Sequence, residues 1–163
     1  MSRNLRQDQR LAVVTRSTTA SPSDVWSVLA DGWLYASWVV GASRVRAVDT
    51  TWPAAGSRLH HSFGVWPAVI DDETTVCESL PQQMLVLQPK GWPAGEALVD
   101  LRIQSTAAGG CELSIVEDAV KGPGTLAPKA ARQRLIAARN NEALRRLALI
   151  AEGRQAGRSI AAQ

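Results

Sequence analysis

Six short segments of alternating apolar and polar residues, separated by brief turns, fill the middle of this 163-residue chain. The segments span residues 43–49, 57–65, 68–79, 83–90, 96–105 and 111–118. Turns such as "GVWP" and "AAGG" join them. Connections this short link antiparallel neighbours, because a parallel crossover needs about a dozen residues or more. The pattern therefore predicts a meandering antiparallel sheet.

Helical patterns and one further strand flank the six segments. Residues 10–20 read as a strand, and "SPSDVWSVLAD" follows with Ser21 as the N-cap and Pro22 at the first helical position. A second short helix is predicted within 33–41, and one long helix runs from about 126 to 153. We expect an α+β domain in which a curved seven-stranded antiparallel sheet wraps around the long helix, with two short helices between strands 1 and 2.

The long helix has an apolar face that is thin in its middle. At about 100° per residue, one face centred on Leu144 gathers a set of mostly aliphatic positions. These are Leu126, Ala130, Gln133, Ala137, Asn140, Leu147, Ala148 and Ala151. The middle of that face is small and polar, which favours a hollow between helix and sheet. Alternatively, Asn140 hydrogen-bonds the backbone in a solid core or lies at a wet rim.

Charge and cysteine usage narrow the class of protein. Residues 1–120 carry 9 basic and 13 acidic side chains, whereas residues 121–163 carry 9 basic and 2 acidic ones. The arginines of the last helix are scattered without aromatic side chains, which favours a solvated face over a nucleic-acid surface. Cys77 and Cys111 lack metal-ligand spacing, so neither a metal nor a cofactor is expected. With no export signal and no membrane-spanning run, we expect a cytoplasmic protein with no integral membrane segment.

Three stretches carry a resemblance to a known family. They are "STTASPSDVWSVLADG" (17–32), "LSIVEDAVKGPG" (113–124) and "RNNEALRRLALIAE" (139–152). Together with the element order, they resemble the START-like (helix-grip) superfamily and its polyketide cyclase/dehydrase and lipid-transport (SRPBCC) group. The resemblance covers 10–153, which leaves 1–9 as a flexible N-terminus and 154–163 as a flexible tail. It implies a carrier or sensor that holds an apolar or amphipathic small molecule, such as a lipid, quinone or polyketide, between sheet and helix.

Two other functions stay open at this point. Some relatives catalyse ring closure or dehydration of polyketides, and another branch activates a chaperone through a protein interaction. The sequence shows no recognisable set of catalytic residues. The weak candidates are His61, Glu78 and Tyr35, with Glu117 as a further inward carboxylate. The consecutive acids 71–73 are interpreted as a solvated turn or strand end. Leu135 and Leu149 lie opposite Leu144 and could form a homodimer patch.

The lining of the expected cavity is assigned from strand alternation, the thin helix face and the tryptophan-rich loops. Alternation with Leu59 and Phe63 places His61, rather than His60, on the inner face. The candidate lining residues are Trp33, Trp38, His61, Phe63, Trp66, Trp92, Val99, Gln133, Ala137 and Asn140.

Overall fold

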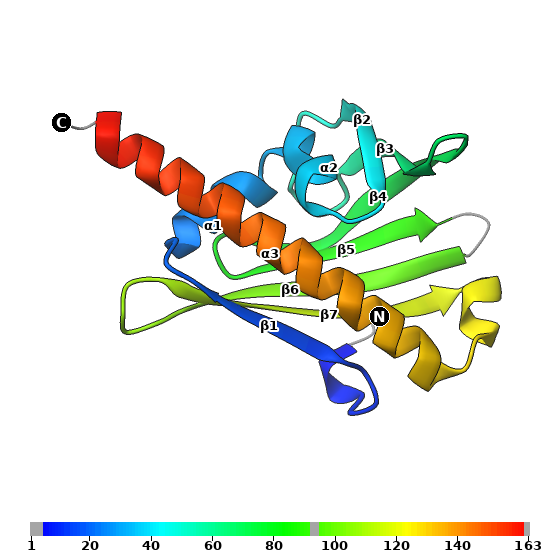
Figure 1. Cartoon of the computed structure of the whole chain (residues 1–163). Coiled ribbons are helices and arrows are strands. Elements are labelled where there is room, and N and C mark those ends of the chain that lie inside the picture. The colour runs from blue at the N-terminus through cyan, green and yellow to red at the C-terminus, as the bar shows by residue number, and fades with distance from the viewer. Residues whose placement is uncertain (1–4, 92–94, 162–163) are drawn as a thin grey trace.

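The computed structural model describes residues 5–91 and 95–161, in which a long helix crosses one face of a seven-stranded antiparallel sheet (Figure 1). The strand order is β1-β7-β6-β5-β4-β3-β2. The strands are β1 (Val13–Thr18), β2 (Ala42–Val48), β3 (Arg58–Val65), β4 (Ala68–Leu80), β5 (Met84–Gly91), β6 (Gly95–Ser105) and β7 (Cys111–Lys121). The helices are η1 (Leu5–Gln7), α1 (Pro22–Leu29), η2 (Gly32–Leu34), α2 (Tyr35–Trp38), η3 (Pro123–Leu126) and α3 (Lys129–Ala161). The predicted fold class is confirmed.

Helix α3 starts later and ends later than the sequence pattern predicts. Ala127 is extended because the following Pro128 disfavours helical backbone at the preceding residue, so Leu126 falls in η3 and is exposed. At the other end the helix passes through Gly153 without a break. Arg154 and Arg158 on this extension contact carboxylates of Asp31 and Asp24, which anchors the last turns against α1 and the residues that follow it.

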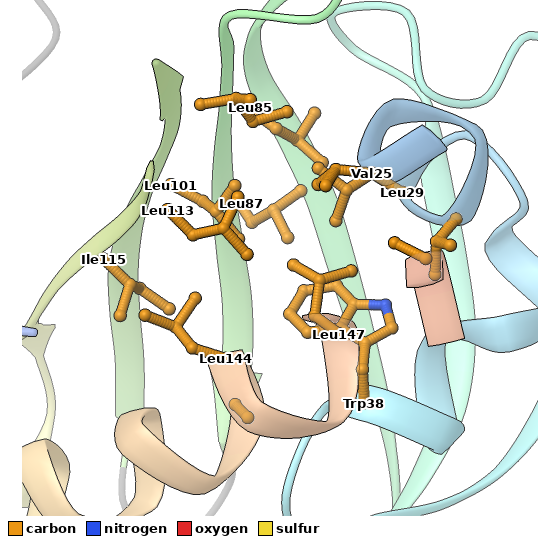
Figure 2. Close-up of a cluster of buried hydrophobic side chains, with 14 of the residues drawn as sticks. Val25, Leu29, Trp38, Leu85, Leu87, Leu101, Leu113, Ile115, Leu144 and Leu147 are labelled. Atoms are coloured by element: carbon orange, nitrogen blue, oxygen red, sulfur yellow. The ribbon is translucent and has the colours of Figure 1, made fainter. Parts of the chain in front are cut away.

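The apolar core lies between the inner face of the sheet and the C-terminal half of α3. Figure 2 shows leucines of β5, β6 and β7 pointing towards Leu144 and Leu147, with Trp38 of α2 beside them. Leu144 and Leu147 are fully buried. Aliphatic side chains therefore fill the interior at this end of the helix, as the Leu144-centred face predicts.

A second apolar cluster covers the outer face of the same sheet. Val86 alternates with the core residues Leu85 and Leu87, and it packs instead with Leu5 and Leu11. Arg6 forms an ion pair with Asp100 at 3.0 Å. Leu5 and Arg6, which belong to the segment that we expected to be a flexible N-terminus, thus contribute contacts to this face. None of the helices within 5–91 and 95–161 is long and apolar enough to cross a membrane.

Candidate functional site

A group of buried polar side chains interrupts the inner face of β3 and β4. The register pairs His61 with Asp72 and Leu59 with Thr74, so Asp72 and Thr74 share the inner face with His61. Tyr35 reaches the same place from α2, and its hydroxyl oxygen lies 2.9 Å from Oγ1 of Thr74. That Oγ1 is 3.1 Å from Nε2 of His61, and a carboxylate oxygen of Asp72 is 3.8 Å from the same nitrogen. We call these four residues the His61 cluster.

Burial sets the protonation of the His61 cluster. It lowers the pKa of His61 to about 4, because the charged imidazolium loses its hydration. It raises the pKa of Asp72 to about 6, although the backbone N–H of Glu73, which donates to the Asp72 carboxylate, opposes the shift. It also raises the pKa of the Tyr35 phenol. At neutral pH the cluster therefore holds a neutral imidazole, a protonated phenol and a mostly ionised Asp72.

A second set of polar groups lies where α3 passes β7. Glu117 is buried on the inner face of β7 and forms an ion pair with Arg139 of α3. Asn140 follows directly on the helix and is also buried. Helix α2, which carries Tyr35, packs against α3, which carries Arg139, and the charges of Glu117 and Arg139 act in opposite directions on the pKa of the Tyr35 phenol. We call the His61 cluster together with Glu117, Arg139 and Asn140 the interior polar site.

Two buried atoms of the interior polar site have no hydrogen-bond partner within the described part of the chain. They are Nδ1 of His61 and Nδ2 of Asn140. Most buried polar atoms in folded proteins are partnered, and an unpaired one costs about 1–3 kcal/mol. The amide of Asn140 can donate to a carbonyl, carboxylate or hydroxyl oxygen, while Nδ1 of His61 donates or accepts according to tautomer. The site is thus equipped to receive an oxygen-bearing group.

Several predicted lining residues lie inside the fold. Trp38 is buried and stacks edge-on to Tyr35, with ring centroids 5.6 Å apart. Val99 is buried and pairs with Glu117 across β6 and β7. Phe63 is half-buried with its ring over Gly41, and Ala137 is half-buried on α3.

Gln133 is buried for a different reason from the one expected. Its Oε1 accepts from the backbone N–H of Ala12 at 2.9 Å, and its Nε2 donates to the carbonyl of Glu117 at 3.0 Å. The side chain therefore closes the strand edge where β1 begins, and these contacts use its polar atoms. It joins the helix to the sheet rather than lining an open space.

Two predicted lining residues point into solvent, and one cannot be placed. Trp33 is 62% exposed and Trp66 is 85% exposed. Trp66 lies at the tip of the β3–β4 hairpin, whose turn extends beyond the helix-covered part of the sheet, so the indole does not line the interior. Trp92 falls outside the described residues.

Glu78 is not an inward carboxylate. A bulge at Cys77 shifts the β4–β5 register, so Val76 pairs with Leu87 but Glu78 pairs with Val86. Val86 belongs to the outer-face cluster. The extra residue reverses the alternation, and Glu78 therefore shares the outer face.

Sequence reasoning missed Asp72, Thr74 and Arg139. The acidic run at 71–73, which was interpreted as a solvated turn or strand end, lies within β4, and Asp72 is buried. Counting back from Val76 in steps of two would have placed Thr74 and Asp72 on the inner face. Arg139 was grouped with the solvated arginines of the helix. Its ion pair was indicated by Glu117, which alternation places on the inner face of its strand, where a carboxylate needs a cationic partner.

Comparison with solved structures identifies the fold. No protein-family model and no curated protein matches the sequence. Protein NE0264 from Nitrosomonas europaea has 15% identity and a TM-score of 0.68 over 91% of this chain and 99% of that chain. Ara h 8.0201 has 8% identity and a TM-score of 0.67 over 88% and 97%, respectively. StfQ, the di-domain ARO/CYC from the steffimycin biosynthetic pathway, has 15% identity and a TM-score of 0.66, over 93% of this chain and 54% of that one.

At TM-scores well above 0.5, these three structures share the overall fold of this chain. The chain therefore has the helix-grip fold, and the resemblance in its sequence is confirmed at the level of fold. Identities of 8–15% carry no further assignment.

Proposed function

We propose that the protein is a carrier or sensor that binds an amphipathic small molecule between the sheet and α3, with the polar end of the ligand at the interior polar site. The observation that carries this proposal is the pair of buried, unpartnered atoms, Nδ1 of His61 and Nδ2 of Asn140. A ligand oxygen that accepts from Asn140 would remove the desolvation cost of its unpartnered amide nitrogen. Binding would therefore gain more from an oxygen-bearing molecule than from a plain hydrocarbon.

Apolar side chains next to the site suit the rest of such a ligand. Phe63 and Ile70 pair across β3 and β4, two residues beyond His61 and Asp72 on the same face. Both are only half-buried, so part of their apolar surface still touches solvent. Ala137 offers a small surface one turn before Asn140 on α3. A ligand body lying here would remove apolar surface from water at about 25 cal/mol per Å².

An aromatic polyketide is the ligand class we favour. Such molecules combine flat apolar rings with several carbonyl and hydroxyl oxygens, which fits the mixture of residues described above. The fold similarity to StfQ, whose name places it in the steffimycin biosynthetic pathway, supports testing this class alongside fatty acids and quinones.

The test is native mass spectrometry of the freshly purified protein, followed by denaturing extraction of any bound molecule. We expect a mass above that of the chain alone, either directly or after incubation with aromatic polyketides, fatty acids or quinones. Ala137→Trp should abolish this added mass, because it places a bulky ring one turn before Asn140 on the same side of α3. The matched control is Ala138→Trp at the exposed neighbouring position, which should bind like the wild type.

A second pair of variants tests the polar end of the ligand. Asn140→Leu keeps a similar volume but removes the donor, and it should weaken binding of an oxygen-bearing ligand about tenfold. Asn141→Leu at the adjacent exposed position should leave affinity unchanged. A clean mass of the chain alone that persists after all three incubations would reject the proposal and favour an interaction module of the chaperone-activator type.

A polyketide cyclase or dehydratase is the second candidate function, favoured by the neutral His61. An imidazole kept unprotonated by burial, with Nε2 held at Thr74, can accept a proton at Nδ1 from a carbon between two carbonyl groups. A poly-β-keto thioester in D2O buffer would exchange that proton for deuterium faster with the protein present than without it. His61→Gln should remove the acceleration; exchange at the buffer rate with wild-type protein would exclude this chemistry.

A further inference from the structure

The outer face of the sheet carries a hollow that is separate from the interior polar site. It is lined by Ser43, Arg44, Ser62, Trp66, Val69 and Asp71 and has a volume of about 560 Å³. Ser62 follows the inward His61 on β3, so its side chain points to the opposite face. We call this feature the Trp66 hollow.

The hairpin that carries Trp66 depends on a glycine. Gly64 pairs with Val69 across this hairpin. Its φ is +110°, and a Cβ at this position would come within 2.3 Å of the carbonyl oxygen of Ala68, so the backbone requires glycine. Trp66 follows two residues later with 85% of its surface exposed. Its indole is therefore an open aromatic surface at the edge of the hollow.

Among the charged side chains around the hollow, Arg44 is not engaged in an ion pair within the described residues. Asp71 is engaged by Arg46 at 3.2 Å and accepts a hydrogen bond from Ser62 at 3.0 Å. Farther along the same face, Glu73 is contacted by Lys90 at 2.9 Å and by Arg58 at 4.0 Å. Arg44 is exposed and, within the described residues, has no ion pair or hydrogen bond from its side chain. A free guanidinium therefore stands beside an exposed indole.

We propose that the Trp66 hollow is a second binding site, for a small planar aromatic carboxylate. The guanidinium of Arg44 suits a carboxylate because its fork of N–H donors can bind both oxygens at once. The indole of Trp66 offers a flat surface on which an aromatic ring can stack, and Val69 closes the apolar side. Asp71 does not oppose the anion strongly, because Arg46 and Ser62 already neutralise and bond its carboxylate. The site is independent of the interior polar site and of the function proposed for it.

The test is a titration of the full chain with 2-naphthoate, followed by calorimetry and by the NMR signal of the Trp66 indole N–H, assigned from its loss in Trp66→Phe. We expect saturable binding with a shift of that signal. Arg44→Gln and Trp66→Ala should each weaken binding about tenfold, as expected when a charge-assisted contact or a stacking contact is lost. Neutral 2-naphthamide should bind about tenfold more weakly than the acid.

Matched controls separate this site from other surfaces. Arg16→Gln on β1, at the other edge of the sheet, and Trp33→Ala at another exposed tryptophan should bind 2-naphthoate like the wild type. Ala137→Trp, which tests the interior, should also leave this binding unchanged. Equal binding by Arg44→Gln would overturn the proposal, as would loss of binding in Ala137→Trp alone. A Trp66-dependent association with anionic phosphatidylserine vesicles, without any binding of 2-naphthoate, would likewise overturn it in favour of a lipid surface.

Discussion

Nε2 of His61 lies 3.1 Å from the Oγ1 of Thr74 in the middle of the inner sheet face, and both residues are fully buried. The same Oγ1 is 2.9 Å from the hydroxyl of Tyr35, so one hydroxyl group joins a strand residue to a residue of α2. Thr74 is thus the shared member of two hydrogen bonds. Its loss should affect both partners, whereas loss of Tyr35 Oη should affect only one.

Thr74→Val should therefore destabilise the protein more than Tyr35→Phe does. Valine keeps the shape of threonine but leaves Nε2 of His61 and the Tyr35 hydroxyl buried and unpaired, at a cost of about 1–3 kcal/mol each. Tyr35→Phe removes one hydroxyl group and leaves the Thr74–His61 bond in place. Urea unfolding of both single variants and the double variant gives the coupling energy. Strictly additive losses would show that Thr74 does not link the two residues.

The opposite pKa shifts of His61 and Asp72 predict opposite dependences of stability on pH. Because the folded protein disfavours protonated His61, its contribution to the free energy of unfolding falls as pH drops from about 6.5 to about 4. Because the folded protein favours protonated Asp72, the contribution of Asp72 to the free energy of unfolding rises as pH drops from about 6 to about 4. The two effects offset each other between about pH 4 and 6 in the wild type.

Removing either partner should expose the effect of the other. Asp72→Asn should lose stability relative to the wild type on acidification, by up to about 3 kcal/mol between pH 6.5 and 4. His61→Gln should gain relative stability over the range from pH 6 to 4, by a similar amount. The measurement is urea unfolding at several pH values, with each variant compared with the wild type at the same pH. Parallel curves for all three proteins would contradict the assigned shifts.

The element order could be predicted from the sequence because alternation and turn residues are local signals. The "GVWP" and "AAGG" turns bound strands that the structure ends within a few residues of the predicted positions. The C-terminal end of α3 could not be predicted this way. Gly153 is a common helix-ending signal, but the ion pairs of Arg154 and Arg158 with residues more than a hundred positions away hold the helix beyond it.

The interior polar site was only partly predictable, because it depends on register. The inward side of His61 follows from alternation within its own strand, and the structure places that side chain inside. Glu78 shows the limit of this reasoning. Cys77 and Glu78 suit either face of a strand, so nothing in the local sequence reveals the bulge that reverses their alternation.

Leu144 should be far more important for stability than Leu149, although the two leucines are little more than one turn apart on α3. Leu144 is fully buried in the core shown in Figure 2, whereas Leu149 is 52% exposed on the opposite side. Leu144→Ala should lower the free energy of unfolding by about 2–5 kcal/mol, because it removes apolar contacts and leaves a cavity. Leu149→Ala should change it by no more than about 0.5 kcal/mol. Comparable losses in urea unfolding would indicate that Leu149 is covered in solution, as a dimer contact would require.

Gln133 should act as a clip between α3 and the start of β1. Its side chain accepts from the N–H of Ala12 and donates to the carbonyl of Glu117, so Gln133→Ala removes one hydrogen bond from each of these backbone groups. We expect a loss of about 1–3 kcal/mol in the free energy of unfolding. The amide of Ala12 should also exchange with D2O faster in the variant, because its acceptor is gone.

Arg134→Ala, at the exposed neighbouring position, is the matched control for this clip and should change neither quantity. If Gln133→Ala only lowered the overall stability, the amides across the whole sheet would exchange faster by a similar factor. The clip instead predicts that the Ala12 amide responds more strongly than the amides at the centre of β7. If Ala12 exchanged at the same rate in the wild type and in Gln133→Ala, the helix would be held at this point by the ion pair of Arg132 with Asp118 rather than by the glutamine.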